Sequence, residues 1–131
     1  MPGEEKLLIV SPVFNEADHL ERTARALAAQ TRPPTRWVVV DDGSRDDTAA
    51  LARRLAAEIA FMEVIDSGQD DGIGPDKLAE AREARAFNHG LERAAWRDYD
   101  FIGKLDGDVE LPPEWFETLL ARFREDPRLG L

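Results

Sequence analysis

Two aspartates separated by one glycine, Asp106-Gly107-Asp108, are the residues of this sequence best suited to metal chemistry. Carboxylates at positions i and i+2 lie on the same side of an extended chain, and the glycine lets the backbone bend so that both can approach one cation. Hard divalent ions such as Mg²⁺ and Mn²⁺ bind through one or two carboxylates together with the phosphates of a substrate. The pattern favours a metal that carries a diphosphate, and a solvated turn is the alternative, because aspartate and glycine are ordinary turn residues.

The residues around this turn predict the elements that must position it. Apolar or β-branched runs predict four strands, at residues 7–10, 36–40, 61–65 and 99–105. Apolar residues at helical spacing predict helices between and after them, at about 18–28, 44–59, 76–97 and 113–123. Asp18 and Ser44 are expected to cap the first two helices, and the Gly-containing stretch 66–75 is expected to be a loop. This alternation predicts an α/β fold, an open, mostly parallel sheet with helices on both faces.

Polar side chains follow three of the four predicted strands. They are Asn15 and Glu16 after the first, Asp41 and Asp42 after the second, and Asp106 and Asp108 after the fourth. In open parallel sheets, ligands bind beyond the carboxyl ends of the strands. Exposure to solvent would explain any one of these clusters. All three, however, follow the same ends of their strands, although each strand has an opposite end that could equally carry charge. The sequence therefore predicts one shared site.

Composition limits the classes of function. The 131 residues suit a single domain, 1–131, and 43% hydrophobic with 34% charged residues is ordinary for a globular protein. The net charge of −10 disfavours nucleic acid as a partner, so an anionic ligand would need a metal or a local group of cations. The sequence has no cysteine and no long apolar run or signal peptide at its start, and we expect a cytoplasmic location.

Four stretches of the sequence together resemble a known family. They are residues 9–16 (Ile-Val-Ser-Pro-Val-Phe-Asn-Glu), 38–48 (Val-Val-Val-Asp-Asp-Gly-Ser-Arg-Asp-Asp-Thr), 86–90 (Ala-Phe-Asn-His-Gly) and 105–109 (Leu-Asp-Gly-Asp-Val). Their order and spacing resemble the family 2 glycosyltransferases of the GT-A fold, a Rossmann-like architecture, across essentially the whole chain. The stretch at 41–48 is the most specific of the four, whereas the Asp-x-Asp motif alone is weak.

The resemblance implies an inverting transfer of a sugar from a nucleoside-diphosphate sugar, with a UDP-sugar expected first, to an unknown acceptor with Mg²⁺ or Mn²⁺. It also implies a role for each matching residue. Pro12, Val13 and Glu16 would line the nucleoside pocket, Asp41 and Asp42 would meet the base, Arg82 or Arg85 would approach the nucleotide or diphosphate, Asp106 would face the ribose or the metal's water shell, and Asp108 would bind the metal directly.

The sequence departs from the family in two ways. Phe87 stands where the family commonly has an arginine, which leaves Arg82 and Arg85 as the substitutes. Family members also continue well beyond this length, so the chain resembles the N-terminal, donor-binding half of the domain. The catalytic base is expected beyond Leu131, and the longer parent protein could lie at the cytoplasmic face of a membrane.

Other functions remain open at this stage. The chain could be a non-catalytic interaction module whose incomplete sheet edge pairs with another chain. A phosphotransfer enzyme with Asp106 as its nucleophile would have Thr or Val at position 110, where this sequence has Glu110. A nucleotidyltransferase would need a Gly-rich basic loop after the first strand, and residues 12–15 do not form one.

Overall fold

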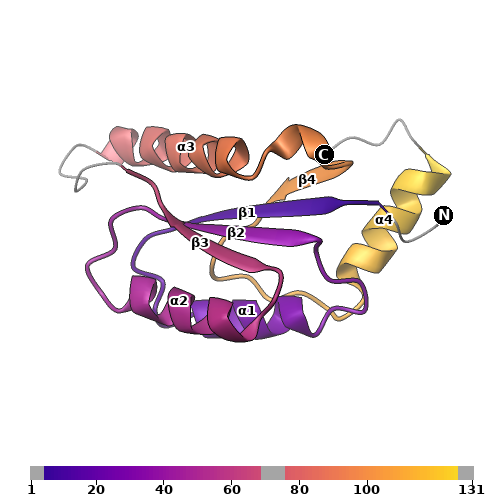
Figure 1. Cartoon of the computed structure of the whole chain (residues 1–131), viewed down its shortest axis with the longest axis horizontal. Coiled ribbons are helices and arrows are strands. Elements are labelled where there is room, and N and C mark those ends of the chain that lie inside the picture. The colour runs from indigo at the N-terminus through magenta and orange to yellow at the C-terminus, as the bar shows by residue number, and fades with distance from the viewer. Residues whose placement is uncertain (1–4, 69–75, 127–131) are drawn as a thin grey trace.

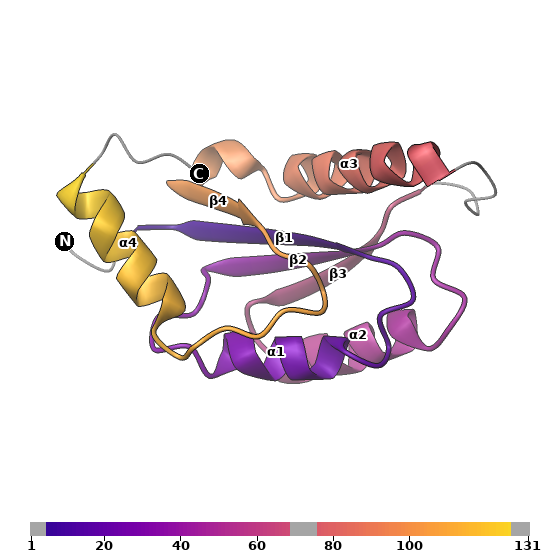
Figure 2. The same cartoon turned by 180° about the vertical axis from the view of Figure 1, so that it is seen from behind.

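The computed structural model describes residues 5–68 and 76–126 of the chain, with side chains from residue 81 onward in the second range. Its elements are β1 (Leu7–Val13), α1 (Leu20–Ala28), β2 (Arg36–Asp41), α2 (Thr48–Glu58), β3 (Met62–Asp66), α3 (Asp76–Arg93), a short 3₁₀ turn η1 (Trp96–Asp98), β4 (Phe101–Lys104) and α4 (Trp115–Glu125). The four described strands are parallel, in the order β3-β2-β1-β4. Helices α1 and α2 cover one face of the sheet and α3 the other (Figures 1 and 2). The predicted α/β fold is confirmed, while most of the predicted loop at 66–75 lies outside the described residues.

The core is divided between the two faces of the sheet by strict alternation along β1 and β2. Leu8, Val10, Val38 and Val40 pack beneath α3 together with Ala86 and Ala94. Their neighbours Leu7, Ile9, Trp37 and Val39 pack on the other side against the buried faces of α1 and α2. Burial on both faces explains why the strands are continuous apolar runs.

Helix α3 approaches the sheet closely at Gly90. A Cβ atom there would lie 2.7 Å from Val10 Cγ1 and 2.8 Å from Val40 Cγ2. Real Cβ atoms do not come this near to other carbon atoms, so a glycine allows the helix to lie at this depth. The close approach fixes α3 over β1 and β2 and therefore fixes the side chains that α3 carries.

Pro12 lies in a central strand, a place where proline normally removes a ladder hydrogen bond. The backbone of Val10 bonds toward β4, where its carbonyl accepts from Leu105, and that of Val13 bonds toward β2, where its carbonyl accepts from Asp42. Backbone groups of successive residues in a strand face opposite neighbours, so the backbone of Pro12, like that of Val10, faces β4. The pairing of β4 with β1 ends at Val10, before Pro12 is reached. The missing N–H costs no bond, because β1 and β4 separate here, at the point where the strand order reverses.

After β4 the chain returns along α1 to α4, which packs near the beginning of the strands. The Gln30 side chain holds this return segment: its Nε2 donates to the Pro112 carbonyl at 2.7 Å, and its Oε1 accepts from the Phe116 amide at 3.2 Å. On α4, Phe123 stacks on Phe101 of β4 with ring centroids 5.1 Å apart. No helix in the described part of the chain is both long and apolar enough to cross a membrane.

Candidate functional site

The loops that follow β1 and β2 are tied together at the carboxyl edge, which is the edge of the sheet at which the parallel strands end. Asn15 has a left-handed backbone with φ 52°, a conformation that asparagine tolerates. Its amide donates to Ser44 Oγ at 2.9 Å, and its Oδ1 accepts from the Arg45 amide at 2.8 Å. The Glu16 amide donates to Thr48 Oγ1 at 2.8 Å. We call these residues, with Asp46, the loop junction.

Asp46 completes the loop junction. Its Oδ1 accepts from the Thr48 amide at 2.9 Å and also from the Thr48 hydroxyl, while Oδ2 accepts from the Ala17 amide at 3.3 Å. The hydrogen bond from the Thr48 side chain is the largest cause that lowers the pKa of Asp46 from its usual value of 3.8. Residues 44–48 of the motif at 41–48 thus hold together the two loops that border the site.

The predicted helix caps are wrong, and the loop junction gives the reason for one of them. Helix α1 begins after His19 and α2 after Asp47, and neither of these residues makes a side-chain capping bond. Ser44 was expected to cap α2, but its hydroxyl accepts from the amide of the neighbouring loop instead. Short polar side chains can bond backbone groups of another segment as readily as those of their own helix.

Asp42 is a buried carboxylate held from two other elements. Only 8% of its surface is exposed. Its Oδ1 accepts from Ser67 Oγ at 2.7 Å, just after β3, and from Arg82 Nη2 at 3.0 Å, on α3. The result is an oriented acceptor at the end of β2, anchored by a charge-assisted bond. The structure thus places Arg82 at Asp42.

Asp41, the preceding residue, has different surroundings although it is equally buried. Its Oδ1 accepts from the Ser44 amide at 3.2 Å, across a turn in which Gly43 has a φ of 76°. This bond stabilises the turn after β2. The two adjacent acids therefore do not act as one pair, and only Asp42 is bound to α3.

The Asp-Gly-Asp turn follows the last ladder bond between β4 and β1, which the Leu105 amide donates to the Val10 carbonyl at 3.1 Å. Gly107 is buried, and a Cβ there would lie 2.9 Å from Val13 Cγ1. Asp106 and Asp108, on either side of it, are both exposed. The backbone of the turn thus packs against the end of β1 and leaves its two carboxylates at the surface.

Glu16 lies beside this turn. Partial burial raises its pKa above the usual 4.5, and the negative charges of Asp108 and, more weakly, Asp106 raise it further, while His19 lowers it. The three acids therefore share one region of negative potential. The structure places Glu16 with the metal candidates, although the resemblance assigns it to the nucleoside pocket.

The Asp-Gly-Asp turn fits a hard divalent cation that also binds a diphosphate. Among the side chains that the structure describes, those of residues 5–68 and 81–126, no three from His, Asp or Glu converge closely enough to enclose an ion. The chain thus offers the carboxylates of Asp106 and Asp108 as accessible oxygen ligands, and an ion could bind one or both of them. Mg²⁺ and similar ions are bound in this way when substrate phosphates and water complete the coordination.

The remaining predicted residues differ in how accessible their side chains are. Val13 is buried and Pro12 is half-buried at the end of β1, while Arg85 is exposed on α3, three residues after Arg82. The structure thus brings Asp42 and Arg82 together, and separately Glu16 with Asp106 and Asp108, around the ends of β1, β2 and β4. Arg85 joins neither group.

Sequence reasoning missed three residues of this region. Phe14 is 48% exposed directly after β1, and its place in the stretch 9–16 could have indicated a role. Ser67 and Thr23 form their key hydrogen bonds to segments 25 and 84 residues away in the sequence. No local pattern marks such contacts.

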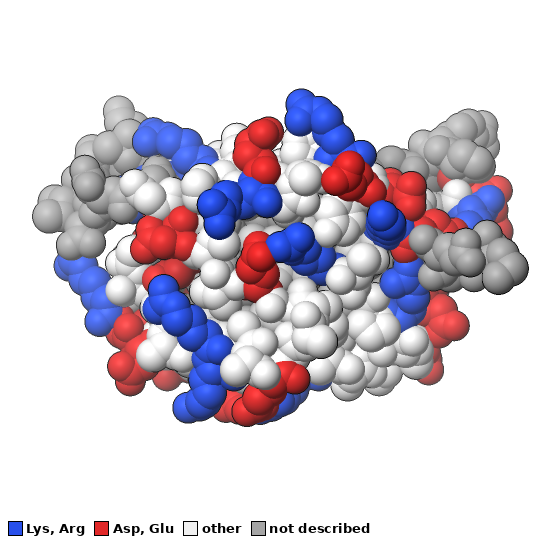
Figure 3. Space-filling model, viewed as in Figure 1, with Lys and Arg blue, Asp and Glu red and all other residues white. Residues whose placement is uncertain are grey.

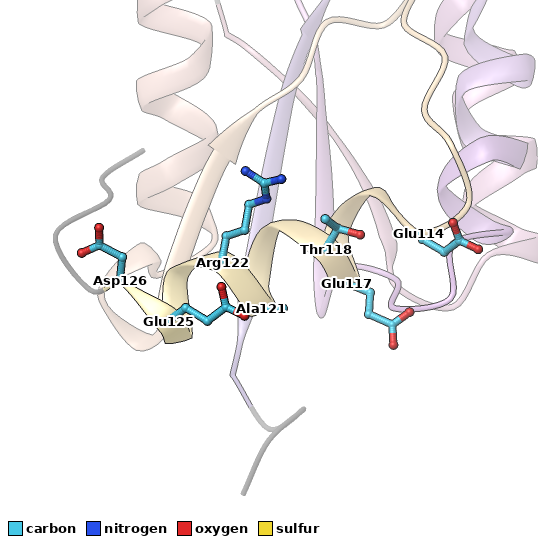
Figure 4. Close-up of a pocket in the computed structure, with 7 residues that line it drawn as sticks. All are labelled: Glu114, Glu117, Thr118, Ala121, Arg122, Glu125 and Asp126. Atoms are coloured by element: carbon cyan, nitrogen blue, oxygen red, sulfur yellow. The ribbon is translucent and has the colours of Figure 1, made fainter.

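A concavity of about 660 Å³ lies elsewhere, on the outer side of α4 (Figure 4). Its lining residues are Glu114, Glu117, Thr118, Ala121, Arg122, Glu125 and Asp126. None of them is a predicted site residue, and α4 packs near the beginning of the strands rather than at the carboxyl edge (Figure 1). This open, acidic surface on α4 is therefore separate from the candidate site at the carboxyl edge.

Comparison with known proteins is consistent with this arrangement. The profile described as Glycosyl transferase family 2 matches residues 8–130. Among curated relatives, the glycosyltransferase AglE of Haloferax volcanii is 28% identical over 111 residues, 83% of this chain and 32% of that protein. The poly-beta-1,6-N-acetyl-D-glucosamine synthase of Staphylococcus aureus is 25% identical over 126 residues, 96% of this chain and 27% of that protein.

Solved structures show the same fold. The crystal structure of S. aureus TarS residues 1–349 in complex with UDP superposes with a TM-score of 0.70 at 24% identity, covering 92% of this chain and 32% of that one. The mannosyltransferase PcManGT from Pyrobaculum calidifontis, in complex with GDP-Man and Mn²⁺, gives 0.68 at 20% identity, covering 98% and 35%. The chain thus spans about a third of the length of the proteins that it matches.

Proposed function

The chain belongs to glycosyl transferase family 2, and on that premise we propose that its carboxyl edge binds the nucleoside-diphosphate-sugar donor of an inverting glycosyl transfer. Structures of S. aureus TarS contain UDP or UDP-GlcNAc, and a glucosyl-3-phosphoglycerate synthase from Mycobacterium tuberculosis contains UDP and Mn²⁺. These ligands belong to proteins with the same fold and support a nucleotide-sugar donor here.

The base would be recognised at Asp42. The N3–H of uracil is a donor, and the Asp42 carboxylate is an acceptor whose orientation is fixed by Ser67 and Arg82. The Asp42 amide is bonded to the Val13 carbonyl at 2.9 Å, so the backbone of Phe14, the next residue, begins beside that of Asp42. The exposed ring of Phe14 would offer an apolar face for a base. Pro12 and Val13 would line the same nucleoside pocket. A UDP-sugar is the donor to test first.

The diphosphate would be bound through a divalent cation, Mg²⁺ or Mn²⁺, held by Asp108 directly and by Asp106 directly or through water. When bound, such a cation stabilises the charge that develops on the departing diphosphate. The chain's own contribution is to hold the two carboxylates on a turn packed against β1. Arg85, exposed on α3, would offer a guanidinium group to a phosphate oxygen, in the place of the arginine that Phe87 replaces.

An anionic donor needs this cation because the protein itself is acidic, with a net charge of −10. On the face seen in Figure 3, basic and acidic side chains alternate and form no extended basic surface. This charge distribution supports a small metal-bound anion, not nucleic acid, as the ligand. We also propose a cytoplasmic location for the protein.

The observation that carries the proposal is that the oriented Asp42 carboxylate and the exposed acids of the Asp-Gly-Asp turn follow the ends of β2 and β4 at the same edge of the sheet. Calorimetry with UDP and GDP, in Mn²⁺ and in EDTA, tests it. We expect Mn²⁺ to tighten UDP binding by about tenfold or more, which corresponds to at least about 1.4 kcal/mol of coupling. A folded sample that binds neither nucleotide, or dimerises without nucleotide affinity, would favour the interaction module instead.

A further inference from the structure

Thr23 lies on α1, is completely buried, and has its hydroxyl directed at the Asp-Gly-Asp turn. Thr23 Oγ1 donates to the Gly107 carbonyl at 3.0 Å and to the Val109 carbonyl at 3.1 Å. These two carbonyls belong to the residues on either side of Asp108. A single side chain from a distant helix therefore holds the backbone around one proposed metal ligand.

The turn needs such a partner because it has left the sheet. Its last ladder bond is the one between the Leu105 amide and the Val10 carbonyl. Carbonyl groups that are buried beyond this point must find a donor elsewhere. A threonine hydroxyl has one hydrogen, so it is shared between the two acceptors in a three-centre bond.

Gly107 restrains the same turn from the side of β1. Its position leaves no room for a Cβ, which would lie 2.9 Å from Val13 Cγ1 and 3.5 Å from Glu16 Cγ. The turn is thus held between the end of β1 and α1, while Asp106 and Asp108 remain exposed. The fixed part is the backbone and the accessible part is the pair of carboxylates.

We propose that Thr23 is a positioning residue for the metal-binding turn, an inference that rests on the proposed function. Its hydroxyl fixes the carbonyl groups of the two residues on either side of Asp108, so that the Asp108 carboxylate is already oriented when a divalent cation and a diphosphate bind. Groups that orient a metal ligand in this way change metal affinity by about 10- to 100-fold when they are removed.

The test is the ratio of UDP dissociation constants in EDTA and in Mn²⁺, measured by calorimetry on the full chain. Thr23→Val replaces the hydroxyl by a methyl group of similar size, and we expect it to lower this ratio by about tenfold while UDP affinity in EDTA stays unchanged. Thr23→Ser restores the hydroxyl and should restore the ratio. If Thr23→Val does not fold, Thr23→Cys, whose thiol is a weak donor, provides the same comparison.

Gln30→Met is the matched control, because Gln30 is also buried and holds the same return segment at Pro112 and Phe116, away from the acids. It should leave the ratio unchanged even if it lowers the melting temperature. The inference is overturned if Thr23→Val keeps the wild-type ratio or if Gln30→Met lowers the ratio equally. If wild-type protein itself shows no difference between Mn²⁺ and EDTA, the proposed function fails, and the inference fails with it.

Discussion

Asp41 and Asp42 are neighbours in the sequence, yet their carboxylates do different work. Asp41 bonds the Ser44 amide within its own turn, whereas Asp42 bonds Ser67, just after β3, and Arg82 on α3. Successive residues of a strand point to opposite faces, so two adjacent acids cannot both face α3 at the strand end. The pair therefore separates into a turn residue and a candidate base-binding residue.

Asp42→Asn should weaken UDP binding by about 10- to 100-fold, because a hydrogen bond that involves a charged group contributes about 1.5–3 kcal/mol. Calorimetry with UDP measures the loss, and circular dichroism confirms folding. Asp66→Asn is the control: it makes the same chemical change at the end of the adjacent strand, where the partner of the Asp66 carboxylate among the described residues is the nearby Gly68 amide. Equal affinities for wild type and Asp42→Asn would remove Asp42 from the base site.

Glu16 predicts a dependence of stability on pH in the metal-free protein. Its pKa is raised in the folded chain, chiefly by burial and then by Asp108, so ionised Glu16 destabilises the fold. The stability that protonation supplies is complete below the usual pKa of 4.5 and is lost as pH rises through the folded pKa. In EDTA at pH 7, Glu16→Gln should therefore unfold at a higher urea concentration than wild type, and the difference should disappear below pH 4.5.

Removal of any negative charge can stabilise so acidic a protein, so the Glu16 result needs a correction. Glu125→Gln, at an exposed carboxylate on α4, supplies it. Glu16→Gln should exceed this control at pH 7. A Glu16 variant no more stable than the control would mean that the acids do not share one field.

Helix α3 must satisfy two requirements at once, because it covers one face of the core and also brings Arg82 to Asp42. Its depth is set by Gly90 against Val10 and Val40. The loop junction has a corresponding role on the other side, where it fixes the starts of α1 and α2. The distance of α3 from the sheet and the bonds of the loop junction thus determine the geometry of the site.

Gly90→Ala should destabilise the protein by about 1–3 kcal/mol, the usual cost of forcing extra atoms into a packed core. The added methyl would meet two buried valines at 2.7 and 2.8 Å. Gly103→Ala in β4 is the comparison, since its methyl would meet only the terminal Cδ1 of Ile9, at 3.0 Å. Urea unfolding should separate the two variants clearly. Equal midpoints would show that α3 can move away from the sheet without cost.

At the scale of the whole molecule, the periods of hydrophobic residues were sufficient to predict the layers. Runs such as 36–40 predicted buried parallel strands, and the structure has them in a parallel sheet whose acids lie at one edge. The contacts of Ser67 with Asp42 and of Thr23 with Gly107 were not predictable, because they depend on how separate layers pack. The Ser44 cap was wrong for a related reason: a neighbouring loop supplied a better partner.

The central claim is that the exposed acids of the Asp-Gly-Asp turn couple a divalent cation to a diphosphate. The most direct measurement compares UDP binding in Mn²⁺ and in EDTA for wild type, Asp108→Asn and Glu110→Gln. Glu110 is the next exposed acid along the chain and is paired with Arg22 at 3.1 Å. Asp108→Asn should abolish the tightening by Mn²⁺ and leave binding in EDTA unchanged, while Glu110→Gln behaves as wild type. Full tightening by Mn²⁺ in Asp108→Asn would contradict the account.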